Sequence, residues 1–304
     1  MTLDSSQIEV LLSTYNGELY VGALLESLWA QTIGDFRLRI RDDGSHDGTV
    51  NLLRELSARE PRVTLTVGAN DGAAQSFLEL LRSADPGADL VALCDQDDVW
   101  FPQKLEWGRD ALSGLDGPAL YCGGIIITDE DLEPLRQHRV PRRGPSFANA
   151  LVENIATGAT IMLNRAAVNL ASKSRPQNMV MHDQWLYLLV SGCGTVIYDP
   201  RPQVLYRQHG SNAVGIAKGF EDWRRRARRQ GRAGHKRVLT KQARELRDLH
   251  YADLDATSRN QLDDFLGSGD SLLARMRYAC FGATFRQRKI DNLIYRVLYF
   301  LKRV

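Results

Sequence analysis

The sequence is poor in cysteine and has no long apolar run, and each absence excludes a class of protein. Its four cysteines, Cys94, Cys122, Cys193 and Cys280, stand far apart and form no pair at metal-ligand spacing. We therefore interpret them as reduced core residues of a cytoplasmic protein. No stretch approaches the roughly 20 apolar residues that cross a bilayer, and residues 1–7 lack the basic start and apolar core of a signal peptide. We expect a chain that is neither exported nor integral to a membrane.

Acidic residues are missing from one stretch of the chain, which makes the charge distribution uneven. The net charge is +2, yet the segment between Asp222 and Glu245 holds ten Lys or Arg and no acid, which leaves −8 on the remainder. Such a run binds nucleic-acid phosphates or an anionic membrane surface, or forms a solvated helical face. Because it contains no aromatic residue beyond Trp223 and no nucleic-acid reading module, we favour peripheral association with the inner face of the plasma membrane.

Short apolar strands alternate with amphipathic helices through the first third of the chain. The strand-like stretches are 8–13, 36–41, 63–67 and 89–94. Between them, apolar residues recur at the spacing of one helical face. Strands alternating with helices predict an α/β fold, with a mostly parallel central sheet covered by helices on both faces.

The second half of the chain is less regular, and its composition changes near residue 218. Its strand-like stretches are 119–128, 160–163 and 196–198. Beyond residue 218 there is no strand-like stretch, and the chain ends in an amphipathic helix with apolar positions Ile290, Leu293, Ile294, Val297, Leu298 and Leu301. We predict a compact α/β domain over 1–217 and a basic, helical extension over 218–304.

Polar side chains follow the predicted strands at the points where the strands end. They are Tyr15, Asn16, Asp42, Asp43, Asn70, Asp71, Asp95, Asp97 and Asp98. In an open parallel sheet the loops after the strands meet at one edge, where ligands bind. These side chains are therefore expected to line one crevice.

Three carboxylates, Asp95, Asp97 and Asp98, occupy four positions after the fourth strand. Like charges this close raise one another's pKa unless a cation or hydrogen-bond donors neutralise them. Mg²⁺ and Mn²⁺ bind such oxygens and are commonly held by one or two protein carboxylates together with water and substrate phosphates. The alternative is a cap for the helix that Pro102 opens. Trp100, which follows the cluster, either walls the site or packs in the core.

A second acidic motif begins at Asp42 and Asp43. A carboxylate there can accept hydrogen bonds from a uracil or thymine imide or from ribose hydroxyls, and Gly44 permits close backbone approach. A turn with a helix cap explains Gly44 and Ser45 but leaves the two carboxylates unexplained. Tyr15 either stacks on the base or packs against its loop.

Five motifs together resemble a known family. In chain order they are Ser13-Thr14-Tyr15-Asn16-Gly17, Arg41-Asp42-Asp43-Gly44-Ser45, Cys94-Asp95-Gln96-Asp97-Asp98-Val99-Trp100, His182-Asp183-Gln184-Trp185 and Tyr206-Arg207-Gln208-His209-Gly210-Ser211-Asn212. The set is similar to glycosyltransferase family 2, in its bacterial rhamnosyltransferase-like branch, over about residues 7–215. The resemblance implies the GT-A fold, a nucleotide-sugar donor, Mg²⁺ or Mn²⁺, and direct displacement with inversion at the anomeric carbon.

The resemblance also assigns roles to residues of this chain. For the nucleotide sugar the candidates are Thr14, Tyr15 and Asp42, joined by the neighbouring Asn16, Asp43, Asn70 and Asp95. For the metal they are Asp97 first, then Asp95, Asp98 and His209.

Asp183 matches the catalytic base of the family, although a carboxylate at a helix start can also be only a cap. The common Glu-Asp pair of the family stands here as His182-Asp183, so His182 either assists or positions the base. Gly158 and Trp185 are candidates for the acceptor or sugar vicinity, with strand entry and core packing as their alternatives.

The sequence thus predicts an inverting, metal-dependent glycosyltransferase. The leading donor is dTDP-L-rhamnose and the acceptor a cell-surface polysaccharide or lipid-linked glycan. One alternative is a nucleotidyltransferase of related fold, which would want a Gly- and Arg-rich phosphate loop where Thr14-Tyr15-Asn16-Gly17 stands. Another is a non-catalytic protein that binds nucleic acid or membrane through its Arg-rich run.

Overall fold

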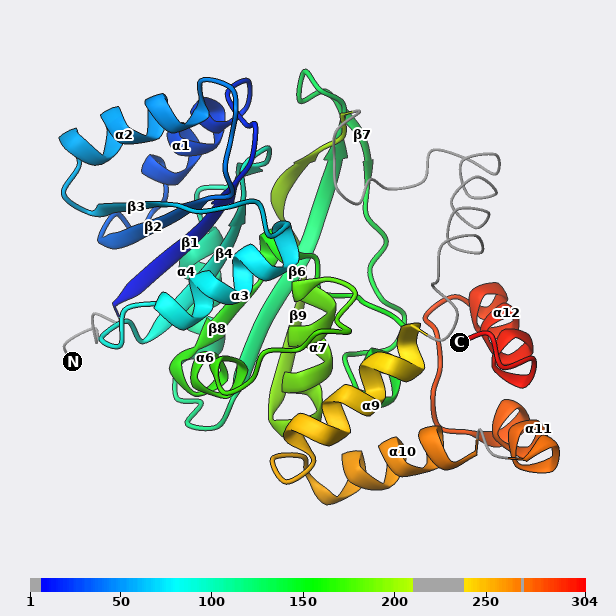
Figure 1. Ribbon diagram of the computed structural model, residues 1–304. Coiled ribbons are helices and arrows are strands. Elements are labelled where there is room, and N and C mark those ends of the chain that lie inside the picture. Colours follow the sequence, from blue (N-terminus) through cyan, green and yellow to red (C-terminus); the bar gives the residue numbers. More distant parts are fainter. Residues whose placement is uncertain (1–6, 210–237, 269–270) are drawn as a thin grey trace.

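The computed structural model describes residues 7–209, 238–268 and 271–304 (Figure 1). Its first four strands are β1 (Ile8–Thr14), β2 (Phe36–Asp42), β3 (Val63–Val67) and β4 (Leu90–Asp95). They pair in parallel in the order β3-β2-β1-β4. The alternation of strands and helices therefore gives the parallel half-sheet that the sequence predicted.

The second half of the chain extends the sheet with mixed pairing. Its strands are β5 (Val99–Trp100), β6 (Ala119–Thr128), β7 (Pro134–Gln137), β8 (Met162–Asn164) and β9 (Thr195–Arg207). β8 runs antiparallel to both β4 and β6, β6 pairs in parallel with β9, and β5 and β7 pair antiparallel with β9 and β6. The central sheet is thus parallel in its first half and mixed in its second.

β9 is longer than the strand predicted over 196–198. Its pairing with β6 shifts register around Gly124, since Gly123 lies opposite Asp199 and Gly124 opposite Pro202. A Cβ on Gly124 would lie 2.8 Å from the carbonyl oxygen of Pro200, so only glycine permits this close approach. The strand therefore continues through two prolines and carries its end to the edge where β4 ends.

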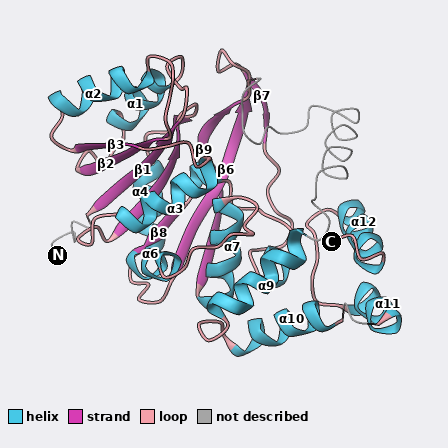
Figure 2. Ribbon diagram, viewed as in Figure 1, coloured by secondary structure: helices cyan, strands magenta, loops and turns pink. Residues whose placement is uncertain are grey.

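Helices cover both faces of the sheet (Figure 2). They are α1 (Val21–Trp29), α2 (Thr49–Arg59), α3 (Ala73–Ser83), α4 (Lys104–Leu112), α6 (Arg165–Ser172) and α7 (His182–Cys193). The alternating side chains of β1 separate two cores, since Val10 and Leu12 pack with α1, α2 and α4, whereas Leu11 packs with α3, α6 and α7. Two short helical turns, α5 (Phe147–Ala150) and η1 (Gly158–Thr160), lead from β7 toward β8.

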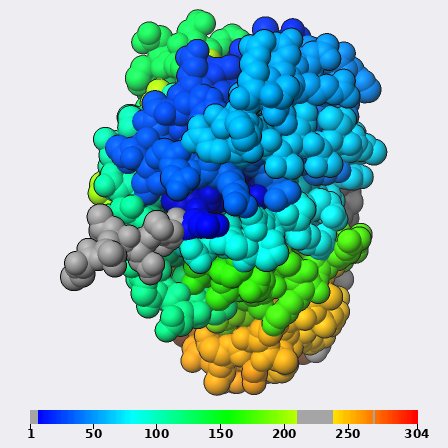
Figure 3. Space-filling view, turned by 90° about the vertical axis from the view of Figure 1, so that its left-hand side faces the viewer, coloured from blue at the N-terminus to red at the C-terminus, as the bar shows by residue number. Residues whose placement is uncertain are grey.

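The C-terminal part is helical, as predicted. It contains α9 (Val238–His250), α10 (Ala256–Gly267), α11 (Leu272–Phe281) and α12 (Lys289–Phe300). Leu246 of α9 and Leu262 of α10 belong to the same buried cluster as α7, and Figure 3 shows these two helices (orange) below the green part of the chain. The predicted domain boundary at 217/218 and most of the Arg-rich run lie outside the described residues.

The helix predicted at the C-terminus is α12. Tyr295 and Tyr299 face inward, 4% and 6% exposed, while the predicted apolar stripe faces outward. Within the described ranges, no helix combines the length and apolarity that a membrane crossing requires.

Candidate active site

The carboxyl ends of three parallel strands lie side by side and carry the polar motifs. Thr14 at the end of β1 is in register with Asp42 at the end of β2. On the other side of β1, Ser13 is in register with Asp95 at the end of β4. The motifs of 14–17, 42–45 and 95–98 are therefore gathered at one edge of the sheet.

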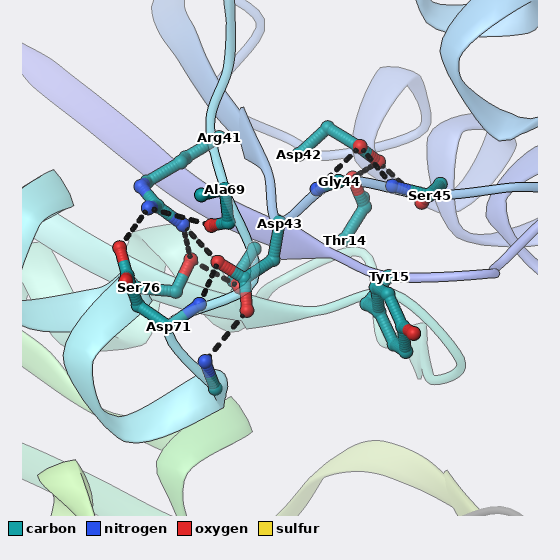
Figure 4. Close-up of polar contacts among 12 residues, drawn as sticks. Thr14, Tyr15, Arg41, Asp42, Asp43, Gly44, Ser45, Ala69, Asp71 and Ser76 are labelled. Atoms are coloured by element: carbon teal, nitrogen blue, oxygen red, sulfur yellow. Dashed lines mark hydrogen bonds and ion pairs between the residues drawn. The ribbon is translucent and has the colours of Figure 1, made fainter.

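The carboxylate of Asp42 organises the loops at one end of this edge (Figure 4). Its Oδ2 accepts hydrogen bonds from Thr14 Oγ1 at 2.8 Å and Ser45 Oγ at 2.6 Å, and its Oδ1 accepts from the backbone N–H groups of Gly44 and Ser45. Asp42 has no exposed surface. This geometry favours a role for Asp42 in shaping the loop.

Asp43 is held in a second, separate network. Its carboxylate pairs with Arg41 and accepts hydrogen bonds from the backbone of Asp71 at 3.1 Å and Gly72 at 2.8 Å. Arg41 also reaches the Asp71 carboxylate at 2.7 Å and the hydroxyl of Ser76 at 3.0 Å. The pair therefore fixes the loop between β3 and α3, in which Asn70 is exposed.

Tyr15 is 40% exposed, and Figure 4 shows its ring pointing away from these networks. Its backbone N–H and carbonyl both bond to the side-chain amide of Gln96, at 2.8 and 2.9 Å, which ties the first loop to the Asp-x-Asp element. Asn16 lies at a positive φ of 49°, and its side chain accepts a hydrogen bond from the backbone of His46. The tyrosine ring is thus presented on a fixed loop.

The Asp-x-Asp element lies between β4 and β5, where the end of β9 meets it. Oδ2 of Asp97 is 2.8 Å from Nε2 of His209. Asp98 is fully buried: its Oδ1 accepts the backbone N–H of Arg207 at 3.1 Å, and its Oδ2 has no hydrogen-bond partner among the described residues. Arg207 also donates to the carbonyl of Asp97 at 2.9 Å.

Acidic side chains lie close together at this edge of the sheet. Burial, together with the neighbouring charges of Asp97 and Asp183, raises the pKa of Asp95 to about 8, against the opposing charge of Lys104. Beneath them lies Lys104, 2% exposed, whose ammonium sits 3.4 Å from the centroid of the Trp100 ring. Burial lowers the pKa of Lys104 to about 7, although the charges of Asp98 and Asp95 act in the opposite direction.

The residues present fit a divalent metal that a substrate helps to hold. No group of three or more His, Cys, Asp or Glu in the described part of the chain is arranged to hold a metal alone. The oxygen-rich set around Asp97, with the unpartnered Oδ2 of Asp98 and a single imidazole from His209, suits Mg²⁺ or Mn²⁺ completed by water and diphosphate oxygens.

Asp183 stands in the first turn of α7, close enough to Asp95 that its charge raises the pKa of Asp95. Burial raises the pKa of Asp183 to about 6, against hydrogen bonds from the backbone of Gln184, the side chain of Asn154 and the backbone of Gly158. A carboxylate held in this way stays ionised at neutral pH yet is a stronger base than an exposed aspartate.

The neighbours of Asp183 are packed differently from one another. His182 is buried and stacks on Phe77 with ring centroids 3.9 Å apart, and burial lowers its pKa to about 3, so it is neutral. A Cβ on Gly158 would lie 2.9 Å from Nε2 of His182, so glycine permits the two segments to touch. Trp185 has no exposed surface, and Trp100 is 3% exposed; both are core residues by burial.

Two residues of this edge were missed from the sequence. Lys104 was not singled out, and Arg207 was noted only as part of a motif. The sequence signal that points to Lys104 is the group of Trp100 and three acids, Asp95, Asp97 and Asp98, within the ten residues before it.

A parallel half-sheet whose strand ends carry polar loops, with an Asp-x-Asp element and a buried carboxylate beyond it, defines a glycosyltransferase of the GT-A fold. Residues 9–169 match the sequence profile of glycosyl transferase family 2, and the chain belongs to that family.

Similar proteins agree with this assignment. The chain is 25% identical to the dTDP-rhamnosyl transferase RfbG of Shigella flexneri, over 93% of its own length and 96% of that protein. It is 26% identical to the UDP-Glc:alpha-D-GlcNAc-diphosphoundecaprenol beta-1,3-glucosyltransferase WfgD of Escherichia coli, over 55% of this chain and 64% of that one. Residues 1–349 of S. aureus TarS in complex with UDP-GlcNAc share the fold at a TM-score of 0.59 and 15% identity, over 98% of this chain and 81% of that one.

Proposed function

We propose that this protein is an inverting, metal-dependent glycosyltransferase that transfers L-rhamnose from dTDP-L-rhamnose to a lipid-linked glycan of the bacterial surface. The observation that carries the proposal is the placement of the buried Asp183 within electrostatic reach of Asp95 at the sheet edge. Similarity to a dTDP-rhamnosyl transferase along nearly the whole chain supports the donor.

In this proposal the nucleoside lies against the ring of Tyr15, on the loop that Thr14, Asp42 and Asn16 hold in place. Asp43 supports that pocket through Arg41 and the loop carrying Asn70. Asp97 and His209 would hold Mg²⁺ or Mn²⁺, with Asp95 and Asp98 beside them. When bound, the cation stabilises charge on the departing diphosphate as a Lewis acid.

Asp183 acts on the opposite side of the sugar. The acceptor hydroxyl loses its proton to the Asp183 carboxylate as the oxygen attacks the anomeric carbon, and the bond to the diphosphate breaks. Asn154 and the backbone of Gly158 orient the carboxylate, and the neutral His182 supports Gly158 by packing. General base catalysis of this kind contributes roughly 10²- to 10⁴-fold to the rate.

The acceptor side of the proposal is a membrane-borne glycan. One relative, WfgD, carries a diphosphoundecaprenol acceptor in its printed name. The ten Lys or Arg between Asp222 and Glu245 suit the anionic inner face of the plasma membrane, at roughly 1 kcal/mol for each residue near the surface.

A donor screen tests the proposal directly. Nucleotide sugars are offered with Mn²⁺, and release of nucleoside diphosphate together with thermal stabilisation is measured, because a ligand that binds the folded state raises its apparent stability. We expect dTDP-L-rhamnose to give both signals. If no nucleotide sugar does, the chain is not a glycosyltransferase of this kind; if a UDP- or GDP-sugar is preferred, only the donor assignment fails.

A further inference from the structure

Helix α12 presents its apolar side chains outward. Six of them are 36–60% exposed, namely Ile290, Leu293, Ile294, Val297, Leu298 and Leu301. Its inward positions are tyrosines with hydrogen-bonded hydroxyls: Tyr295 meets Thr284 at 2.7 Å, and Tyr299 donates to the carbonyl of Phe265 at 2.6 Å. A helix that folds only onto its own chain buries its apolar stripe, so this orientation indicates an external apolar contact.

Helix α11 continues the same pattern. Leu272, Leu273, Met276 and Phe281 are 62%, 70%, 50% and 86% exposed. Its inward residue is again a tyrosine, Tyr278, which packs on α12 through Tyr299 with ring centroids 4.7 Å apart. The exposed apolar residues of both helices are called the α11–α12 surface below.

The charged residues around the α11–α12 surface are almost all basic. Residues 271–304 contain eight Lys or Arg and one acid, Asp291. The exposed members of this set are Arg277, Arg288, Lys289, Lys302 and Arg303. Exposed apolar side chains with a cationic rim match the boundary of an anionic lipid bilayer, where the apolar groups enter the acyl region and the cations meet headgroup phosphates. A symmetric contact between two copies would instead bring two such rims together and repel.

The α11–α12 surface is connected to the acceptor end of the active site through the segment before α12. Asn149 donates to the carbonyl of Phe285 at 3.0 Å, Arg286 donates to the carbonyl of Val152 at 3.0 Å, and the backbone of Gln287 donates to Glu153 at 2.6 Å. The chain then passes directly from residue 153 to Asn154, whose side chain donates to the proposed base Asp183. The same segment is tied to the loop after β7, since Arg143 stacks over the ring of Phe285 at 3.5 Å.

Figure 1 places α11 and α12 at the edge of the molecule away from β1, β2 and β3. Those strands carry the nucleoside end of the site. A contact made by the two helices therefore leaves the nucleoside end free, while the short connection from residues 285–287 to 149–154 keeps the base close to that contact.

We propose that the α11–α12 surface docks on an anionic lipid bilayer and so presents a membrane-borne acceptor to Asp183. The role of this docking rests on the proposed function. Binding of lipid by the α11–α12 surface does not depend on that function. The contact is assigned to side chains other than the Arg-rich run of 224–237.

The test compares the parent chain with the α12 variant Leu293→Ser/Val297→Ser. The matched control is Leu52→Ser/Leu249→Ser, which replaces leucines on α2 and α9 that are 45% and 42% exposed. Flotation is measured with vesicles of phosphatidylcholine containing phosphatidylglycerol, and with vesicles of phosphatidylcholine alone. We expect the parent and the control to bind the anionic vesicles, and the α12 variant to bind at least about tenfold more weakly. Equal binding by the α12 variant, or no binding by the parent, overturns the proposal.

A second variant removes charge without touching packing. Lys289→Gln/Arg303→Gln changes two exposed residues and should weaken vesicle binding about tenfold, more strongly at low salt than at high salt. Sedimentation velocity measures the oligomeric state of the parent and both variants. If the parent is a dimer that does not bind vesicles, and Leu293→Ser/Val297→Ser dissociates that dimer, the surface contacts a second copy and the proposal is contradicted.

Release of nucleoside diphosphate in vesicle-free solution separates this inference from the proposed function. It should be the same for the parent and both variants. If no nucleotide sugar is turned over, the proposed function fails while the vesicle result still decides the docking surface.

Discussion

Nε2 of His209 lies 2.8 Å from Oδ2 of Asp97, although 112 positions separate the two residues in the chain. The contact joins the end of β9 to the loop after β4 and stacks His209 on Tyr20, with ring centroids 4.5 Å apart. It places one candidate nitrogen ligand beside the Asp-x-Asp element, where the other candidate ligands are oxygens.

The first prediction follows from this contact. His209→Ala should raise the Mn²⁺ concentration for half-maximal turnover by roughly 10- to 100-fold, because it removes a side chain that binds or orients the ion. His138→Ala, in the loop after β7, is the matched control and should leave the Mn²⁺ requirement unchanged. An unaltered metal titration for His209→Ala would remove His209 from the metal site.

The second prediction concerns the buried cation. Lys104→Met should lower the free energy of unfolding by about 3 kcal/mol, since it removes a buried cation that lies over the Trp100 ring and compensates Asp95 and Asp98 when they are ionised. Urea unfolding measures the change. Lys173→Met removes a lysine 59% exposed that pairs with Asp253, and this control should cost less than about 1 kcal/mol. Equal losses for the two variants would mean that Lys104 contributes only packing.

The third prediction separates the organising role of Asp42 from direct contact with the nucleoside. Thr14→Val keeps the side-chain shape and removes the 2.8 Å hydrogen bond to the buried carboxylate of Asp42. The free energy of unfolding should therefore fall by roughly 1.5–3 kcal/mol. If Asp42 mainly shapes the loop, donor KM should rise as well, because the loop that carries Tyr15 loosens. A rise in KM without any loss of stability would instead place Thr14 in direct contact with the donor.

The fourth prediction is a pH dependence. Asp183 must be deprotonated to accept a proton, and burial raises its pKa to about 6, so kcat/KM should be constant above that value and fall tenfold per pH unit below it. His182→Gln should keep this acidic limb, because the pKa of His182, lowered to about 3 by burial, lies far below the window. If kcat/KM of His182→Gln did not fall at acidic pH, the titrating group would be the imidazole of His182 and not Asp183.

Local sequence pattern was sufficient for the first half of the fold. Val10 and Leu12 alternate with Leu11, and each set is buried on its own face of the sheet. The ends of β1, β2 and β4 met at one edge because parallel strands connected by helices leave no other arrangement.

Long-range geometry explains what the sequence could not reveal. The course of β9 depends on Gly123 and Gly124 of another strand, which admit its prolines. The burial of Lys104 depends on the ring of Trp100 and on acids that only the folded strand end brings together. The periodicity of α12 identified a helix with an apolar stripe, but a period does not tell whether that stripe faces the core or an external surface.

The central claim is that Asp183 is the base of a glycosyl transfer at this edge. Asp183→Asn is nearly isosteric, and the measurement is a single-turnover assay with bound dTDP-L-rhamnose, Mn²⁺ and a glycan acceptor, alongside the donor Kd. The account predicts an unchanged Kd and a transfer rate reduced by roughly 10²- to 10⁴-fold. A transfer rate within a few-fold of the parent, at equal donor occupancy, would contradict it.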